Sequence, residues 1–147
     1  MGKEKIVLYT NVLVSALGWN GKPKKVFNKI LNKEFDLIIS KEQLDELKKV
    51  LNYPKFEFTN DQKLRFLNIV SEISYIVDIK NRLKVVKEDP DDDIIIETAL
   101  ENNANIIISG DEHLLKLKKF KNIKIMTCSE FLEKKVINLK ILLKDIR

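Results

Sequence analysis

Lys5-Ile-Val-Leu-Tyr9 is the first of four short, apolar runs that decide the fold class of this chain. The other three are Asp36–Ser40, Asn105–Ser109 and Asn122–Met126, and Tyr75–Val77 is either an edge strand or a loop. Runs of this kind between helical stretches are typical of strands that are buried on both faces of a parallel sheet. We therefore expect an α/β fold, a three-layer α/β/α sandwich with a parallel sheet of four to five strands.

Helix-start signals separate the apolar runs. They are three capping-box pairs and one N-cap before proline: Ser40 with Gln43, Thr59 with Gln62, Thr127 with Glu130, and Asp89-Pro90. The helices that we expect are Pro23–Lys33, Lys41–Leu51, Asp61–Ser74, Pro90–Asn102 and Ser129–Val136. The alternation of strands with capped helices supports the α/β assignment.

The chain has the size and composition of one globular domain. It has 147 residues, of which 44% are hydrophobic and 33% are charged. No stretch approaches the roughly 18 to 20 apolar residues of a membrane span, so we expect no membrane partner. We expect one domain over residues 1–133 and a basic, amphipathic C-terminal extension over residues 134–147.

The cysteine content and the N-terminus indicate a cytoplasmic protein. Cys128 is the only cysteine, which excludes an intramolecular disulfide and favours a reducing compartment. Met1–Leu17 has lysines before an apolar run, as a signal peptide does. However, Glu4 lies in the basic part and Thr10-Asn11 interrupts the apolar part, so we do not expect a signal peptide.

The charge is unevenly distributed along the chain. The formal net charge of +5 permits a polyanionic partner without requiring one. Residues 88–101 contain seven acidic and no basic residues, whereas residues 134–147 contain five basic residues and one acidic residue. A helix N-terminus favours acidic side chains, which accounts for Asp89 and Asp91. Asp92 shares a helix face with the apolar Ile96 and Ala99, so this carboxylate is expected to point toward the core.

Acidic and polar residues also follow two of the expected strands. Tyr9-Thr10-Asn11 follows the first and Ser109-Gly110-Asp111 the third, and the carboxyl ends of parallel strands form the functional crevice of such sheets. If Glu46 and Asp92 converge with Asp111 there, three mutually repelling carboxylates would protonate or recruit a cation. Donors that are all oxygen suit Mg²⁺ or Mn²⁺.

Three stretches, in this order and spacing, resemble PIN domains: Ile6-Val-Leu-Tyr-Thr-Asn-Val-Leu-Val-Ser-Ala-Leu17, Asp89-Pro-Asp-Asp-Asp93 and Ile107-Ile-Ser-Gly-Asp111. The similarity is closest to the branch of toxin components of toxin–antitoxin modules, and it covers about Lys5 to Glu133. It implies that residues 1–133 form a Mg²⁺- or Mn²⁺-dependent ribonuclease that cuts single-stranded or structured RNA. It also implies a protein antitoxin as a partner and a homodimer as the assembly.

The resemblance assigns roles to eight positions. The implied catalytic residues and metal ligands are Glu46, Asp92 and Asp111, with Asp93 as an auxiliary ligand. The implied supporting residues are Thr10, Asn11 and Ser109. The eighth position, Tyr9, departs from the family, because the first acidic ligand of PIN domains falls there.

Tyr9 is a poor substitute for a carboxylate ligand. A phenol has a reference pKa of about 10, so it is neutral at pH 7 and binds Mg²⁺ weakly. Loss of a direct ligand is expected to lower metal affinity or activity at least about 10- to 100-fold. We expect an impaired ribonuclease; the alternative is a catalytically inactive PIN-like module that binds RNA or a protein antitoxin.

Two other α/β functions lack the residues that they require. A phosphoacceptor receiver domain needs an acidic pair where this chain has Tyr9-Thr10-Asn11. A dinucleotide-binding domain needs a glycine-rich first turn, and none of the four glycines is placed there.

Three features outside the predicted metal site have competing interpretations. Trp19 either closes an edge of the core, which we favour, or stacks on an RNA base. His113 is expected to be a surface residue rather than an acid or base. The basic tail from Lys134 either contacts RNA or forms a partly packed helix, and we favour the helix.

Overall fold

The computed structural model describes residues 3–80, 90–133 and 144, with the backbone alone for residues 90–92. Its centre is a six-stranded sheet in the order β3-β2-β1-β4-β6-β5. The strands are β1 (Lys5–Leu8), β2 (Asp36–Ser40), β3 (Ser74–Val77), β4 (Ile106–Ile108), β5 (Lys119–Phe120) and β6 (Ile123–Met126). Neighbouring strands are parallel except β5 and β6, which are antiparallel.

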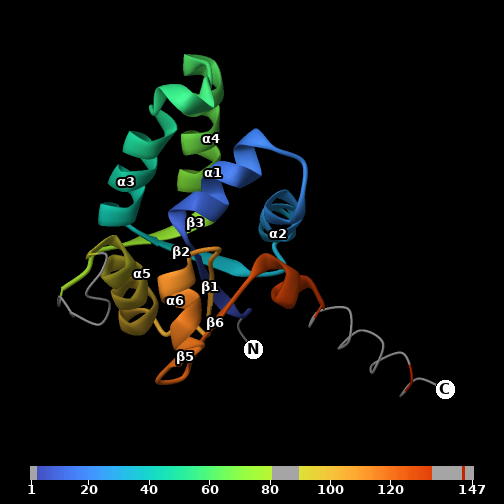
Figure 1. Ribbon diagram of the computed structural model, residues 1–147, viewed down its shortest axis with the longest axis vertical. Coiled ribbons are helices and arrows are strands. Elements are labelled where there is room, and N and C mark those ends of the chain that lie inside the picture. Colours follow the sequence, from blue (N-terminus) through green and yellow to red (C-terminus); the bar gives the residue numbers. More distant parts are fainter. Residues whose placement is uncertain (1–2, 81–89, 134–143, 145–147) are drawn as a thin grey trace.

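Helices cover both faces of this sheet. They are α1 (Thr10–Gly18), α2 (Lys22–Leu31), α3 (Lys41–Leu51), the 3₁₀ helix η1 (Pro54–Phe56), α4 (Asn60–Ile73), α5 (Pro90–Glu101) and α6 (Glu112–Leu117), and residues 128–133 are also helical. The chain runs from β1 toward β3 in one direction and from β4 toward β6 in the other. Right-handed crossovers in opposite directions place α1–α4 on one side and α5 and α6 on the other, as Figure 1 shows. The expected three-layer sandwich is confirmed, but the sheet has six strands rather than four to five, because the short β5 adds an antiparallel strand at its edge.

The central strands have the burial that their composition predicts. Ile6, Val7 and Leu8 of β1 and Ile106, Ile107 and Ile108 of β4 are at most 2% exposed. Both faces of these strands are covered by helices, so the side chains on both faces are apolar. The hydrophobic core is therefore centred on the same two strands whose ends carry the predicted site.

Most element boundaries agree with the sequence prediction. The helix expected over Lys41–Leu51 is α3, and Tyr75–Val77 belongs to an edge strand, β3, rather than a loop. The first strand ends at Leu8, so its expected end at Tyr9 is wrong; Tyr9 is already the N-cap residue of α1. Strand β5 and the helices α1, η1 and α6 are not among the segments named above.

Two of the three predicted capping boxes are complete. The Thr59 hydroxyl accepts from the amide of Gln62, whose side chain accepts from the amide of Thr59, and Thr127 and Glu130 make the same pair of bonds. At α3 the Ser40 hydroxyl accepts from the Gln43 amide, but the Gln43 side chain bonds elsewhere. The predicted N-cap Asp89 lies outside the described residues.

Two further predictions concern regions that the structure describes only in part. Almost all of the predicted extension over residues 134–147 lies outside the described residues, as does the end of the helix expected over Ser129–Val136. Within the described part of the chain, no helix combines the length and the apolar composition that crossing a membrane requires.

Candidate active site

The predicted site lies where the direction of the chain reverses across the sheet. β1 and β4 are parallel neighbours, and the chain leaves them toward opposite edges. The Tyr9 amide donates to the Ile108 carbonyl over 2.8 Å, so the segment after β1 and the segment after β4 start side by side. Such a switch point at the carboxyl ends of parallel strands is where open α/β sheets bind ligands.

Thr10 connects the end of β1 to the predicted acid of α3. Thr10 is the first residue of α1 and is 1% exposed. Its hydroxyl donates a hydrogen bond of 3.0 Å to Oε2 of Glu46, which is half-buried. This contact brings Glu46 to the carboxyl end of β1, as the sequence analysis expected.

Gln43 supports the site structurally, which differs from the capping role that its spacing after Ser40 predicts. Its side chain is 1% exposed, and its Nε2 donates to the Leu8 carbonyl at the end of β1. This carbonyl precedes Tyr9, so Gln43 fixes the backbone at the position of the missing acid. The capping-box spacing after Ser40 hid this role, because the same spacing predicts a local bond.

Asp111 follows β4 and serves as the N-cap of α6. Its amide donates to the buried Ser109 hydroxyl over 2.9 Å, and its Oδ1 accepts from the amides of His113 and Leu114. Oδ2 takes neither capping bond, so helix capping and metal binding can use different oxygens of one carboxylate. His113 is exposed, as expected.

Two carboxylates on α5 are buried. Asp93 is 8% exposed, and Glu97, one helical turn later, is 1% exposed. The sequence analysis named Asp93 as an auxiliary ligand and did not single out Glu97. An acidic residue between Ile96 and Thr98 in an otherwise buried stretch was the available signal. The side chain of Asp92 lies outside the described residues, so its predicted inward direction stays a prediction.

The described residues have the type of donor atom that a divalent cation binds, but they do not bring enough donors together. Glu46, Asp93 and Asp111 offer only oxygen, the donor that Mg²⁺ and Mn²⁺ prefer. However, no three acidic, histidine or cysteine side chains gather into a metal-binding group within the part that the structure describes. Tyr9 is 6% exposed, so a neutral phenol occupies interior space at the end of β1.

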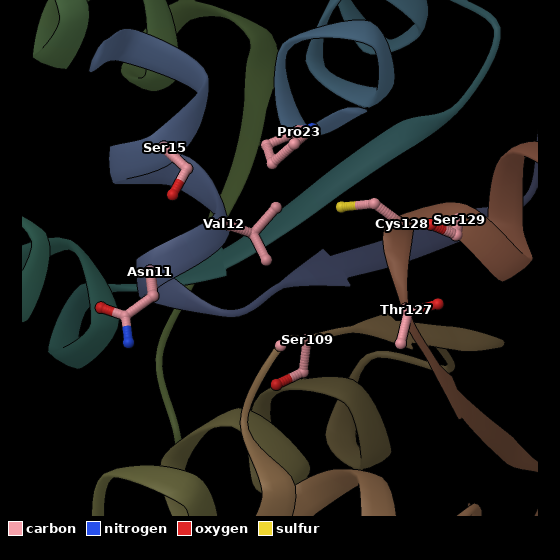
Figure 2. A pocket seen from close by; sticks show the side chains of 9 residues that line it. Asn11, Val12, Ser15, Pro23, Ser109, Thr127, Cys128 and Ser129 are labelled. Atoms are coloured by element: carbon pink, nitrogen blue, oxygen red, sulfur yellow. The ribbon is translucent and has the colours of Figure 1, made fainter. Parts of the chain in front are cut away.

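A cavity of about 260 Å³ opens beside the residues that follow β1 and β4 (Figure 2). It is lined by Asn11, Val12, Ser15, Pro23, Ser109, Gly110, Thr127, Cys128 and Ser129. Lys22 donates to the Ser129 hydroxyl over 2.6 Å, which places a cation close to this lining residue. The cavity is therefore lined by both apolar and hydroxyl side chains, with one lysine bonded at its edge.

The Cys128 thiol points toward Val12 and Pro23 in this cavity. Burial raises its pKa above the ordinary value of 9.0, while a backbone hydrogen bond and the charge of Lys22 act in the opposite direction. The thiol is therefore protonated at neutral pH and a weak nucleophile.

The fold and the site define a class: an α/β/α domain with acidic and polar residues at the switch point of a mostly parallel sheet. A family model described as PIN domain matches residues 5–113. This match covers well over half of the chain, and the chain belongs to the PIN domain family. PIN domains are generally nucleases, and the family typically uses divalent metal ions.

Two solved structures resemble the fold. VapBC2 from Rickettsia felis, in a crystal structure bound to a DNA fragment from its promoter, aligns with a TM-score of 0.58 and 18% identity over 82% of this chain and 96% of that chain. PAE2754 from Pyrobaculum aerophilum aligns with a TM-score of 0.52 and 14% identity over 96% and 99%. At these identities the likeness concerns the fold. No curated protein sequence matches the chain.

Proposed function

We propose that this chain is a Mg²⁺- or Mn²⁺-dependent ribonuclease of the PIN type, with metal affinity lowered by Tyr9. The proposed ligands are Glu46, Asp92 and Asp111, with Asp93 as an auxiliary ligand. The observation that carries the proposal is the hydrogen bond from Thr10 to Glu46, because it joins the acid of α3 to the strand end that lies beside Ser109 and Asp111. Membership of a family of nucleases supports the same assignment.

The residues of this chain position the proposed ligands. Thr10 restrains one oxygen of Glu46, and Ser109 fixes the backbone of Asp111. The first amides of α6 hold Oδ1 of Asp111, which limits rotation of its carboxylate. A bound Mg²⁺ or Mn²⁺ would lower the pKa of a water molecule that it binds and would offset negative charge on the phosphate.

Tyr9 explains why we propose weakened metal binding. A carboxylate at this position would add a charged oxygen donor at the end of β1, whereas the phenol is neutral at pH 7. The phenol is also larger than a carboxylate, and Tyr9 is buried. Fewer donors lower the affinity of a site for Mg²⁺, which otherwise keeps its water ligands.

The test compares the unmodified chain with Tyr9→Asp, and with Tyr9→Phe as a matched control that adds no donor. Isothermal titration with Mn²⁺ measures the affinity, and cleavage of single-stranded RNA in the presence of Mn²⁺ measures the activity. We expect Tyr9→Asp to bind Mn²⁺ about 10- to 100-fold more tightly and to cleave faster, with Tyr9→Phe unchanged. Equal, robust cleavage by the unmodified chain and Tyr9→Asp would contradict the proposed impairment.

The burial of Tyr9 favours a second candidate, a catalytically inactive PIN-like module that binds RNA or a protein antitoxin. The likeness to VapBC2, a protein named for a toxin–antitoxin complex, supports an antitoxin as a partner, and the homodimer is proposed on the family resemblance alone. Absence of Mn²⁺ binding by the unmodified chain, together with retained RNA binding, would favour this candidate over the enzyme. Light scattering tests the homodimer.

A further inference from the structure

Four aromatic side chains gather at the end of α1 that is farthest from the proposed metal site. They are Trp19, which follows α1, and Tyr53, Phe56 and Phe58, which lie on and around η1. We call this group the aromatic platform. It joins two segments that are more than 30 residues apart in the sequence.

Three rings of the platform are nearly parallel. The ring centres of Phe56 and Phe58 are 5.6 Å apart with an interplanar angle of 16°, and those of Tyr53 and Phe56 are 6.4 Å apart with an angle of 8°. Trp19 meets Phe56 and Phe58 edge-on, with ring centres 6.0 and 6.4 Å apart. These contacts join the four side chains into one cluster.

The platform remains open to solvent. Trp19 is 54% exposed and Tyr53 is 41% exposed, whereas Phe56 and Phe58 are half-buried beneath them. Trp19 is therefore not part of the buried core, although its ring contacts Phe56 and Phe58, which pack against that core. A Cβ on Gly18 would lie 3.1 Å from the Phe58 ring, so the glycine allows this ring to sit against the end of α1.

Basic residues lie beside one side of the platform. Residues 48–65, which carry three of its four rings, contain five basic and two acidic residues. The Lys55 ammonium lies 5.1 Å from the centre of the Phe56 ring. Lys63 donates to the side chain of Asn52, next to Tyr53. This charge is complementary to a polyanion.

One helix connects the platform to the proposed active site. Thr10 and Asn11 begin α1, and Trp19 follows its last residue. Nine helical residues span about 13 Å, a distance that roughly four stacked nucleotides also cover. A single RNA strand of this length is therefore long enough to reach from one region to the other.

We propose that the aromatic platform is a binding subsite for unpaired bases of single-stranded RNA. This inference rests on the proposed ribonuclease function and deepens it, because it specifies single-stranded rather than structured RNA. Exposed rings with lysines beside them match the chemistry of single strands, whose bases stack on aromatic side chains while lysines attract the phosphates. In an RNA duplex the bases are stacked on one another and do not offer their faces to the platform.

Trp19 provides a direct probe, because it is the only tryptophan of the chain. The protein is titrated with a single-stranded oligoadenylate of about ten nucleotides, in EDTA so that no cleavage occurs. An abasic oligonucleotide of the same length and charge serves as the control. We expect the oligoadenylate to quench the emission of Trp19 and the abasic strand to leave it unchanged.

Variants test the platform independently of this fluorescence. Trp19→Ala and Tyr53→Ala are each expected to weaken binding of labelled RNA, measured by anisotropy, about 5- to 100-fold. Trp19→Phe keeps a ring and should retain most of the affinity. Tyr75→Ala is the matched control, because Tyr75 is a 57% exposed aromatic residue on the edge strand β3. Circular dichroism checks that every variant is folded.

The outcomes separate this inference from the proposed function. RNA binding that leaves the Trp19 emission unchanged and tolerates Tyr53→Ala would overturn the platform and leave the ribonuclease proposal standing. Quenching by RNA without cleavage after Tyr9→Asp would support the platform and contradict the ribonuclease. No RNA binding at all would overturn both the platform and the ribonuclease proposal. A change in Trp19 emission with a protein partner but not with RNA would also overturn both.

Discussion

The two ends of α1 lie in different chemical environments. At its start, Thr10 is almost fully buried and its hydroxyl bonds to a carboxylate of α3. At its end, the Trp19 side chain is more than half exposed and meets the rings of Phe56 and Phe58 edge-on. The first region depends on directional bonds between buried polar groups, and the second depends on apolar surface.

This difference shows which region tolerates change. A buried polar group that loses its partner keeps the full cost of leaving water, whereas an exposed ring can shift at little cost. Substitutions at the start of α1 should therefore lower the free energy of unfolding. Substitutions at its end should alter binding while leaving the fold intact.

The largest expected effect on stability is at Gln43. Gln43→Leu removes the donor to the buried Leu8 carbonyl, and we expect the free energy of unfolding in urea to fall by about 1 to 3 kcal/mol. Gln62→Leu is the matched control, because Gln62 has the same position in the capping box of α4 but is exposed. We expect its cost to be about 0.5 kcal/mol. Equal losses for the two variants would contradict the special role of Gln43.

A smaller effect is expected at Thr10. Thr10→Val keeps the shape of the side chain but removes the hydrogen bond to Glu46, and we expect a loss of about 1 kcal/mol because water reaches the half-buried carboxylate. Thr10→Ser keeps the hydroxyl and should be closer to the unmodified chain. If both variants lose the same free energy, packing of the methyl group rather than the hydrogen bond is what matters.

The smallest effect concerns Cys128, which lies across the cavity from the middle of α1. Burial raises the pKa of this thiol, so the folded chain holds the proton more tightly than the unfolded chain does. Its contribution to stability is complete below the ordinary pKa of 9.0 and is lost as the pH rises above it. Urea unfolding at increasing pH should show a slightly steeper decline for the unmodified chain than for Cys128→Ala. Identical slopes would count against burial as the cause.

Local patterns in the sequence predicted much of the fold. The bounds of α3 and the capping boxes at Thr59 and Thr127 follow from residues within a few positions of each other. The apolar runs also identified the parallel strands locally. A strand that is covered on both faces is apolar throughout, and this composition is visible in the strand itself. The two-residue β5 is too short to show a periodicity, so nothing in its composition distinguished it from the surrounding loop.

The candidate site was predictable in composition but not in its contacts. The order of the motifs placed Thr10, Ser109 and Asp111 at the correct strand ends, because the end of a strand is a local property. The same motif at Ser40 led to the wrong partner for Gln43, since a capping box and a buried bond to β1 have identical spacing. Burial of Glu97 depends on what covers α5, which its own residues do not specify.

The sequence by itself determined the class of this protein and the departure at Tyr9, because both are written in the identity and order of residues along single elements. The tertiary structure alone decided which distant residues meet. Thr10 and Glu46 are 36 positions apart, and Trp19 lies against rings of a segment that follows α3. Such contacts depend on the angles at which helices pack on the sheet. These angles result from burying all the apolar faces together, so no local pattern contains them.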